Sequence, residues 1–141
     1  MFISTSYYML LIIIIIICIA NDIFIIAHAA TIRPHSVSGV SSGGFMAIQH
    51  HISYNKDVFG VGSIAGGPFF CAQDKLAIAM NACMSAPEFI SVTELVTITY
   101  TTYTTTRTID DPSNTKGDKI WLFSGTQDKK VKPGVIAKTF S

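Results

Sequence analysis

The amino-acid sequence predicts an α/β fold, a parallel β-sheet with crossover helices, and two observations support this class. Strand-like and helix-like segments alternate from residue 32 onward, which is typical of parallel strands joined by helices. Turns follow two of the strand-like segments, at 39–44 and 125–128. The 141 residues leave room for one domain. In such sheets the functional groups lie beyond the carboxyl ends of the strands, so both turns are candidate sites.

The first half of the domain is predicted to alternate between extended and helical segments. Pro34 keeps the start of the first extended segment out of a helix. In the helix after the glycine-rich turn, Phe45, Ile48 and Ile52 recur near one face, which is a helical spacing. The elements expected here are extended segments at 32–38 and 58–65 and helices at 45–52 and 72–84.

The second half contains the clearest predicted strand, at 119–124. Ser91 and Glu94 match a capping box, which predicts that a helix begins there. The threonine-rich residues 96–108 leave helical and extended structure both open, because β-branched residues favour strands. The remaining elements expected are a polar loop at 110–118, a loop at 125–128 and a helix from 133 to 140.

The N-terminal segment is predicted to be a secretory signal peptide, residues 1–29, with the domain at 30–141. Residues 9–20 carry no polar side chain, but a bilayer span needs roughly 20 apolar residues. Ala27-His28-Ala29 supplies the small-x-small pattern that precedes a cleavage site. The alternative is an uncleaved membrane anchor over 9–27. Both interpretations place the domain outside the cytosol, so we expect a secreted protein that meets a membrane only if this segment is retained.

Charge and cysteine usage exclude several classes of partner. The chain has 10 Lys+Arg against 9 Asp+Glu, so no basic surface indicates a nucleic-acid partner. It has no CxxC pair and no Cys/His cluster at ligand spacing, so neither a zinc site nor a cofactor is expected. Cys18 would leave with the signal peptide. Cys71 and Cys83 remain, and an even pair in an exported chain suggests a disulfide, with two buried free thiols as the alternative.

Residues 39–43 match the pattern G-x-S-x-G, which predicts a nucleophilic serine at Ser41. In this arrangement the serine stands on a sharp strand-to-helix turn, and the flanking glycines leave room for the strained backbone. The backbone N–H of Ser42, at the start of the helix, would donate to the oxyanion that develops during ester cleavage. The alternative is an ordinary glycine and serine turn, such as one that binds phosphate.

Asp128 is the candidate acid that would orient a catalytic histidine. It follows the predicted strand at 119–124 by a short loop, and it follows Ser41 in chain order. Both features are typical of hydrolases with a serine, aspartate and histidine triad on an α/β sheet. The alternative is a solvated turn, because Lys129 and Lys130 lie beside it.

Beyond these motifs, the sequence resembles the secreted poly(3-hydroxybutyrate) depolymerase-type esterases. The resemblance is carried, in family order, by residues 36–47, 65–73, 82–87, 109–114, 118–128 and 131–135. It implies a partial α/β-hydrolase fold, an ester substrate, Ser41 as nucleophile, Asp128 as triad acid and a disulfide joining Cys71 to Cys83. Some members of the family are circularly permuted, which would explain why only about ten residues separate Thr31 from Ser41.

The general base of the triad is the missing part. No histidine follows His51 in the sequence. His50 and His51 lie roughly 14–15 Å along the helix from Ser41, at ~1.5 Å per residue. His35 lies on the order of 20 Å back along the strand, at ~3.3 Å per residue, and His28 falls in the signal peptide. A hydrogen bond needs about 3 Å, so these histidines are expected to have packing or surface roles.

The function expected from the sequence is therefore that of a secreted serine esterase that cleaves short-chain hydroxyalkanoate esters through an acyl-enzyme on Ser41. The chain would be its N-terminal part, truncated at the C-terminus and inactive by itself because the histidine is absent. The first alternative is a noncatalytic, hydrolase-like binding protein, secreted or tethered to a membrane. The second is an unrelated small membrane-anchored protein with a chance glycine and serine turn.

Overall fold

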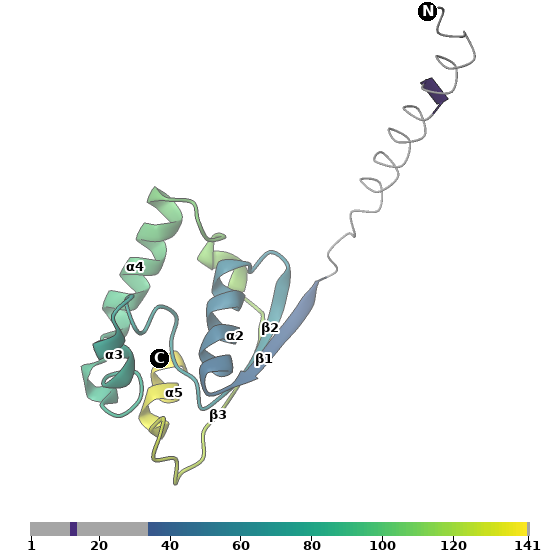
Figure 1. Ribbon diagram of the computed structural model, residues 1–141. Coiled ribbons are helices and arrows are strands. Elements are labelled where there is room, and N and C mark those ends of the chain that lie inside the picture. Colours follow the sequence, from purple (N-terminus) through teal and green to yellow (C-terminus); the bar gives the residue numbers. More distant parts are fainter. Residues whose placement is uncertain (1–11, 14–33, 141) are drawn as a thin grey trace, which may run out of the picture. The chain divides into compact units, whose positions relative to one another are not determined.

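The computed structural model describes Ile12, Ile13 and residues 34–140 (Figure 1). The chain divides into two units, Met1–Ile32 and Arg33–Ser141, and the fold below is that of the second. Apart from Ile12 and Ile13, the predicted signal peptide lies outside the described residues, as do Cys18 and His28. No helix in the described part combines the length and the apolar character that crossing a bilayer requires.

A three-stranded sheet forms the centre of the domain. Its strands are β1 (His35–Val40), β2 (Val58–Ile64) and β3 (Lys119–Phe123). The strand order is β1-β2-β3, and both pairings are parallel. The predicted parallel sheet with crossover helices is thus confirmed. Because all three strands point the same way, the segments that follow β1 and β3 leave the sheet at the same edge.

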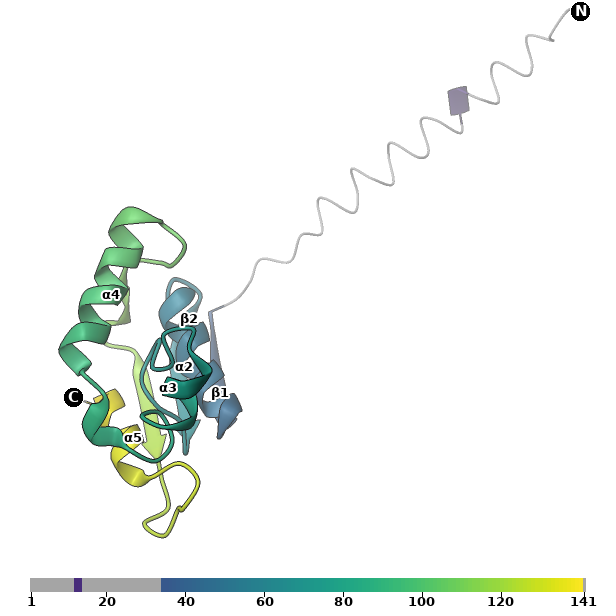
Figure 2. The same ribbon diagram turned by 60° about the vertical axis from the view of Figure 1, so that its left-hand side comes forward.

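Helices fill the connections between the strands and extend beyond the last one. They are α2 (Ser42–Ser53), α3 (Leu76–Met80), α4 (Val92–Thr105) and α5 (Pro133–Phe140), with short 3₁₀ turns η1 (Pro87–Phe89) and η2 (Pro112–Thr115). Figure 2 shows α5 beside the carboxyl end of β3, and the two elements are in contact. The predicted helices at 45–52 and 133–140 are confirmed, and the first is longer at both ends.

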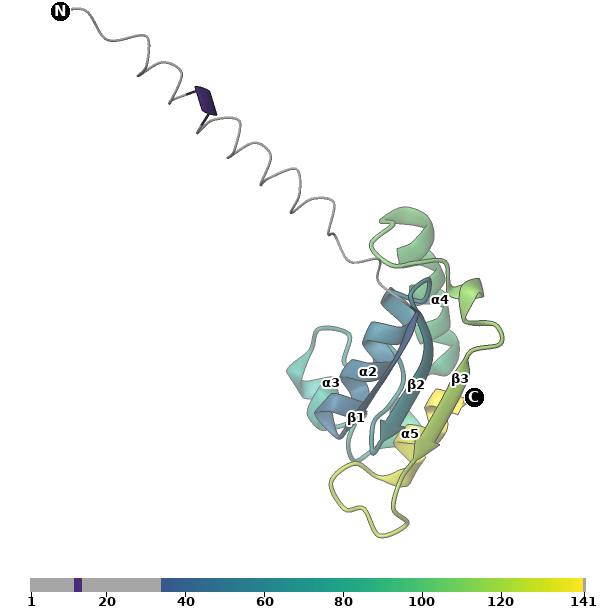
Figure 3. The same ribbon diagram turned by 90° about the vertical axis from the view of Figure 1, so that its right-hand side faces the viewer.

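Helix α2 covers one face of the sheet, where Ala47 and Ile48 form a buried cluster with Val61 of β2. The other face has no cover from the described residues (Figure 3). Trp121 and Phe123 of β3 stack there with ring centroids 6.0 Å apart. The register places Ser38, Gly62 and Trp121 side by side on this face.

The predicted helix at 72–84 is wrong, because only Leu76–Met80 is helical. A disulfide joins Cys71 to Cys83 with the two Cα atoms 6.0 Å apart. A continuous helix would separate these residues by about 18 Å at ~1.5 Å per residue. Left-handed backbone at Gln73 (φ 48°) and Asp74 (φ 57°) turns the chain before the helix begins.

Residues 96–108, for which helical and extended structure were both possible, are helical as far as Thr105, where α4 ends. Its threonine hydroxyls donate to carbonyls one turn earlier, for example Thr97 to Thr93 (2.8 Å) and Thr105 to Thr101 (2.7 Å). At the start, Ser91 Oγ accepts from the Glu94 N–H at 3.4 Å, so the predicted N-cap is confirmed. The Glu94 carboxylate accepts from the Gln73 side chain (3.4 Å) and not from the Ser91 N–H, so only the N-cap half of the predicted capping box forms.

The predicted polar loop before β3 is organised by Asp111, the N-cap of η2. Its carboxylate accepts from the Ser113 N–H at 2.9 Å. This hydrogen bond holds the pKa of Asp111 below its ordinary value. A lowered pKa means that the charged carboxylate stabilises the turn above the ordinary pKa, and that the contribution is lost as the pH falls through the lowered value.

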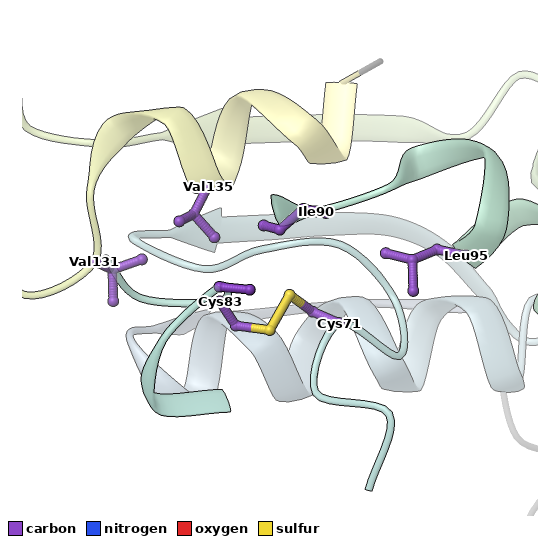
Figure 4. Close-up of a cluster of buried hydrophobic side chains, with 7 residues drawn as sticks. Cys71, Cys83, Ile90, Leu95, Val131 and Val135 are labelled. Atoms are coloured by element: carbon purple, nitrogen blue, oxygen red, sulfur yellow. A yellow bond between two sulfur atoms is a disulfide. The ribbon is translucent and has the colours of Figure 1, made fainter. Parts of the chain in front are cut away.

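The main hydrophobic cluster lies between the long connections and α5 (Figure 4). Its buried members are Cys71, Ala82, Cys83, Ile90, Leu95, Val131 and Val135. Phe45, from the first turn of α2, packs against it. The disulfide is therefore part of the core, and that core contacts the helix that begins next to Ser41.

Candidate active site

Ser41 alone forms the turn between β1 and α2. The strand runs to Val40 and the helix begins at Ser42, so the turn is tighter than the predicted 39–44. Ser41 has φ 56° and ψ −122°, a conformation that costs a non-glycine residue about 1–3 kcal/mol. Its N–H donates to Ile64 O at 2.8 Å, and the residue is exposed. A strained serine on a sharp strand-to-helix turn is the geometry of a nucleophile elbow.

The space around the elbow requires glycine at two positions. A Cβ on Gly39 would lie 2.2 Å from Gly43 O, and a Cβ on Gly44 would lie 2.8 Å from Ile64 O. A Cβ on Gly43 would meet no atom within 4 Å. The predicted role of the flanking glycines therefore holds for Gly39 and is wrong for Gly43, and Gly44 is the second position where the backbone passes closely.

The segment after β2 packs closely against the start of α2. A Cβ on Gly66 would lie 2.2 Å from Ser63 Oγ and 2.8 Å from Gly44 C. Ser63 Oγ is fully buried and donates to Gly44 O at 3.1 Å. These contacts hold the first turn of α2 against the end of β2, which keeps the elbow in its strained form.

Ser41 and Ser42 line a cavity of about 470 Å³. Most of its wall is apolar. The lining residues are Ser41, Ser42, Phe45, Met46, Gln49, Phe70, Cys71, Ala72, Gln73, Asp74, Ala79, Cys83, Met84 and Val131. A largely apolar cavity with a few polar groups is typical of a small-molecule site. Sequence reasoning identified the two serines but missed the wall that 70–84 contributes, because that segment was predicted to be mostly helix.

The backbone N–H of Ser42 makes no hydrogen bond within the described residues. Ser42 is the first residue of α2, and the first N–H groups of a helix have no acceptor within it. The Ser41 side chain makes no capping hydrogen bond with them. In the described part of the chain, the Ser42 N–H therefore remains free to donate at the cavity.

Asp128 lies in the loop after β3, at the same sheet edge as Ser41. Its Oδ1 accepts from the N–H groups of Lys130 (2.8 Å) and Val131 (3.1 Å). Oδ2 takes part in no hydrogen bond within the described residues. Asp128 does not line the cavity, whereas Val131 does. The carboxylate thus shapes its own turn and keeps one oxygen for a further donor.

The described histidines lie away from this cavity, as the sequence predicts. His51 is 1% exposed, and its Nε2 lies 2.8 Å from Asp118 Oδ2. Asp118 directly precedes β3, at the edge of the sheet opposite Ser41. His50 contacts the rings of His35 (centroids 6.0 Å apart) and Tyr54 (4.9 Å). None of the three histidines among residues 34–140 lines the cavity.

His51→Ala is expected to destabilise the domain by about 1–3 kcal/mol, because it leaves the largely buried Asp118 carboxylate without its partner. His50→Ala is the matched control: His50 lies on the same helix, and removing it breaks only ring contacts. Urea unfolding of both variants measures the difference. Equal losses would contradict a structural role for the pair of His51 and Asp118.

The disulfide between Cys71 and Cys83 agrees with the pairing that the resemblance implied. The alternative of two free thiols is wrong for this structure. Both half-cystines line the cavity beside Ser41. Within residues 34–140, no three His, Cys, Asp or Glu side chains come together as a metal site would require.

Known proteins match most of the chain. Over 102 residues it is 44% identical to a poly(3-hydroxybutyrate) depolymerase from Delftia acidovorans. This match covers 72% of this chain and 20% of that enzyme. Over 113 residues it is 34% identical to a polyhydroxybutyrate depolymerase from Talaromyces funiculosus, covering 77% and 31% of the two chains. The matched residues are homologous to a part of each of these two depolymerases. No protein-family model matches it.

Solved structures of depolymerases have the same fold over this homologous segment. The crystal structure of the depolymerase from Penicillium funiculosum matches with a TM-score of 0.64 at 30% identity, over 77% of this chain and 33% of that one. A serine-to-alanine variant of a PHB depolymerase, complexed with an R3HB trimer, also matches with a TM-score of 0.64, at 29% identity. The predicted family resemblance and the partial α/β-hydrolase fold are therefore confirmed. The chain spans 20% and 31% of the two curated depolymerases that it matches.

Proposed function

We propose that the chain is the N-terminal part of a serine esterase that hydrolyses short-chain hydroxyalkanoate esters, with Ser41 as nucleophile. The observation that carries the proposal is the strained Ser41 (φ 56°) on the wall of an apolar cavity. It lies within the segment that is 44% identical to a depolymerase. Homology supports a carboxylic ester hydrolase, and the geometry of Ser41 supports a covalent mechanism.

In the proposed mechanism, Ser41 Oγ attacks the carbonyl carbon of the ester while a histidine takes the hydroxyl proton. The Ser42 N–H donates to the carbonyl oxygen as it gains negative charge. The C–O bond to the alcohol then breaks, and the alcohol leaves with the proton that the histidine returns. Water, activated by the same histidine, cleaves the acyl-serine to release the acid and restore the Ser41 hydroxyl.

Asp128 is proposed to hold that histidine in the required tautomer and orientation. Two backbone N–H groups fix Oδ1, and Oδ2 has no hydrogen bond within the described residues. One fixed and one available oxygen suit a carboxylate that accepts an imidazole N–H. The histidine would come from chain beyond Ser141, as would the second donor to the oxyanion. A circular permutation that places the remaining strands there would account for the short stretch before Ser41.

The proposed substrates are neutral esters with short acyl groups. The cavity beside Ser41 is mostly apolar, with Phe45, Met46, Phe70 and Met84 among its lining residues. A matching depolymerase was solved in complex with an R3HB trimer, which supports hydroxybutyrate esters as ligands for the homologous site. No nucleic acid, metal or cofactor has a part in this proposal.

Export is proposed from two features. The first is the apolar run at 9–20 with Ala27-His28-Ala29 after it, interpreted as a signal peptide over 1–29. The second is the disulfide between Cys71 and Cys83, since disulfides persist mainly in oxidising compartments. The domain at 30–141 would then act outside the cell, or at a membrane if the first segment is retained.

We expect residues 30–141 by themselves to hydrolyse p-nitrophenyl butyrate no faster than a Ser41→Ala variant. Serine is a weak nucleophile without an adjacent base, and no histidine of the described residues lines the cavity. Initial rates of release of p-nitrophenol, measured on the two purified proteins, check this. A rate well above the buffer background that Ser41→Ala abolishes would contradict the proposed incompleteness.

A noncatalytic binding protein is the second candidate, because the mostly apolar cavity beside Ser41 could hold an ester without a general base. The cavity and the elbow would then serve to bind an ester without cleaving it. Sequencing the transcript past the codon for Ser141 discriminates the two. A continued reading frame with a histidine after a strand supports the esterase, and one with further strands but no histidine supports the binding protein.

A further inference from the structure

We propose that the Cys71–Cys83 disulfide is the positioning element of the active site, holding together the cavity wall beside Ser41 and the turn that carries Asp128. This inference rests on the proposed function, which gives Ser41 and Asp128 their roles. It assigns to the disulfide a task beyond cross-linking the chain, and three sets of contacts support it.

The first set concerns the cavity wall. Residues 70–84 supply more than half of the residues that line the cavity, including both half-cystines. Regular structure in this stretch is limited to the five residues of α3. Phe70 (φ 54°), Gln73 (φ 48°) and Asp74 (φ 57°) all have left-handed backbone, which side chains other than glycine adopt at a cost. A segment of this kind needs an external constraint, and the disulfide closes it at both ends.

The second set links the disulfide to Asp128. The N–H of Lys132 donates to Met84 O, next to Cys83, at 2.8 Å. The Val131 side chain is 3% exposed and belongs to the same buried cluster as both half-cystines (Figure 4). The Val131 N–H in turn donates to Asp128 Oδ1 at 3.1 Å. Val131 therefore connects the disulfide to Asp128, because its side chain packs with the half-cystines and its N–H donates to the Asp128 carboxylate.

The third set shows that the Ser41 turn is held by the sheet, although Phe45 further along α2 packs against the disulfide's cluster. The Ser41 N–H is bonded to Ile64 O of β2, and α2 packs on the sheet through Ala47, Ile48 and Val61, in a cluster that contains neither cysteine. Opening the disulfide should therefore release the wall and the Asp128 turn and leave the elbow in place. A disulfide that merely stabilised the domain would give no such division.

The test is hydrogen–deuterium exchange of residues 30–141 with and without the disulfide. Cys71→Ala together with Cys83→Val removes the bond and keeps apolar side chains in the cluster. We expect exchange at least tenfold faster in 69–84 and 128–132, with 39–41 unchanged. Leu95→Ala is the matched control, because Leu95 belongs to the same cluster but does not line this cavity. It should not accelerate exchange in 128–132 selectively.

Two outcomes would overturn the proposal. One is uniform acceleration that includes 39–41, and the other is unchanged exchange at 128–132. If the double variant unfolds in buffer, the comparison is repeated in trimethylamine oxide, which favours the folded state. A variant that still does not fold would make the disulfide a requirement of the whole domain, which also contradicts a selective positioning role.

A binding measurement separates this inference from the proposed function. Titration of the oxidised chain with the (R)-3-hydroxybutyrate trimer, followed by NMR, should shift signals of residues 41–46 and 70–74. In the double variant we expect affinity at least tenfold weaker, with equal affinity contradicting the inference. Failure of the trimer to bind the oxidised chain would contradict the proposed substrate class, while the exchange pattern would still decide the role of the disulfide.

Discussion

Ser41→Ala is expected to lower kcat by about 10⁶-fold in a chimera that carries residues 34–140 of this chain in place of the matching segment of the Delftia acidovorans depolymerase. The chimera supplies the regions of the enzyme that this chain does not cover. Removing the hydroxyl removes the acyl-enzyme, and only binding and oxyanion stabilisation remain. Initial rates with p-nitrophenyl butyrate, at saturating ester, measure the loss.

Two further variants of the chimera make this result specific. Asp128→Asn should lower kcat by about 10⁴-fold, because the amide would favour the wrong histidine tautomer. Ser38→Ala is the control, since Ser38 is an exposed serine on the same strand that does not line the cavity. A folded chimera in which Ser41→Ala and Ser38→Ala have the same rate would show that Ser41 is not the nucleophile.

Gly39→Ala is expected to destabilise the domain by about 3 kcal/mol or more. The added Cβ would lie 2.2 Å from Gly43 O and 2.9 Å from Gly43 Cα. These are backbone atoms, so no side-chain rotation relieves the clash, and the strand or the first turn of α2 must move. Overpacking of this kind commonly costs about 1–3 kcal/mol and occasionally more. Urea unfolding followed by circular dichroism measures the change.

Gly43→Ala provides a matched comparison within the same pentapeptide. A Cβ there meets nothing within 4 Å, and Gly43 is helical. Replacing a helical glycine by alanine at a site without strain stabilises by about 0.4–1 kcal/mol. We therefore expect the two substitutions to have opposite signs. A loss from Gly43→Ala as large as that from Gly39→Ala would contradict the described packing of the elbow.

Local sequence patterns predicted the parts of the fold that local physics dominates. The strands at 58–64 and 119–123 and the helix at 133–140 lie almost where hydrophobic patterning placed them. The Ser91 cap was predictable because Ser91 and Glu94 are three residues apart on one turn. The elbow was predictable in kind, because G-x-S-x-G is the pattern of a serine on a sharp strand-to-helix turn.

The errors have a common cause in contacts between residues distant in sequence. Residues 72–84 have good helix-forming composition, but the disulfide and the left-handed backbone at Gln73 and Asp74 prevent a continuous helix. The threonines of α4 were ambiguous because β-branched residues favour strands, and packing favours the helix, with Leu95 of α4 buried in the main cluster. Gly44 and Gly66 were not recognised as close contacts, because they meet only after β2 folds onto α2.

The sequence by itself determined the class of the sheet, the order of its elements, the strained serine and the resemblance to depolymerases. These properties depend on residue type and spacing along the chain. The tertiary structure alone decided the cavity wall, the pairing of His51 with Asp118 and the route from the disulfide through Val131 to Asp128. The physical reason is that burial and hydrogen bonding across tens of residues depend on the packing of all elements together, which no local pattern contains.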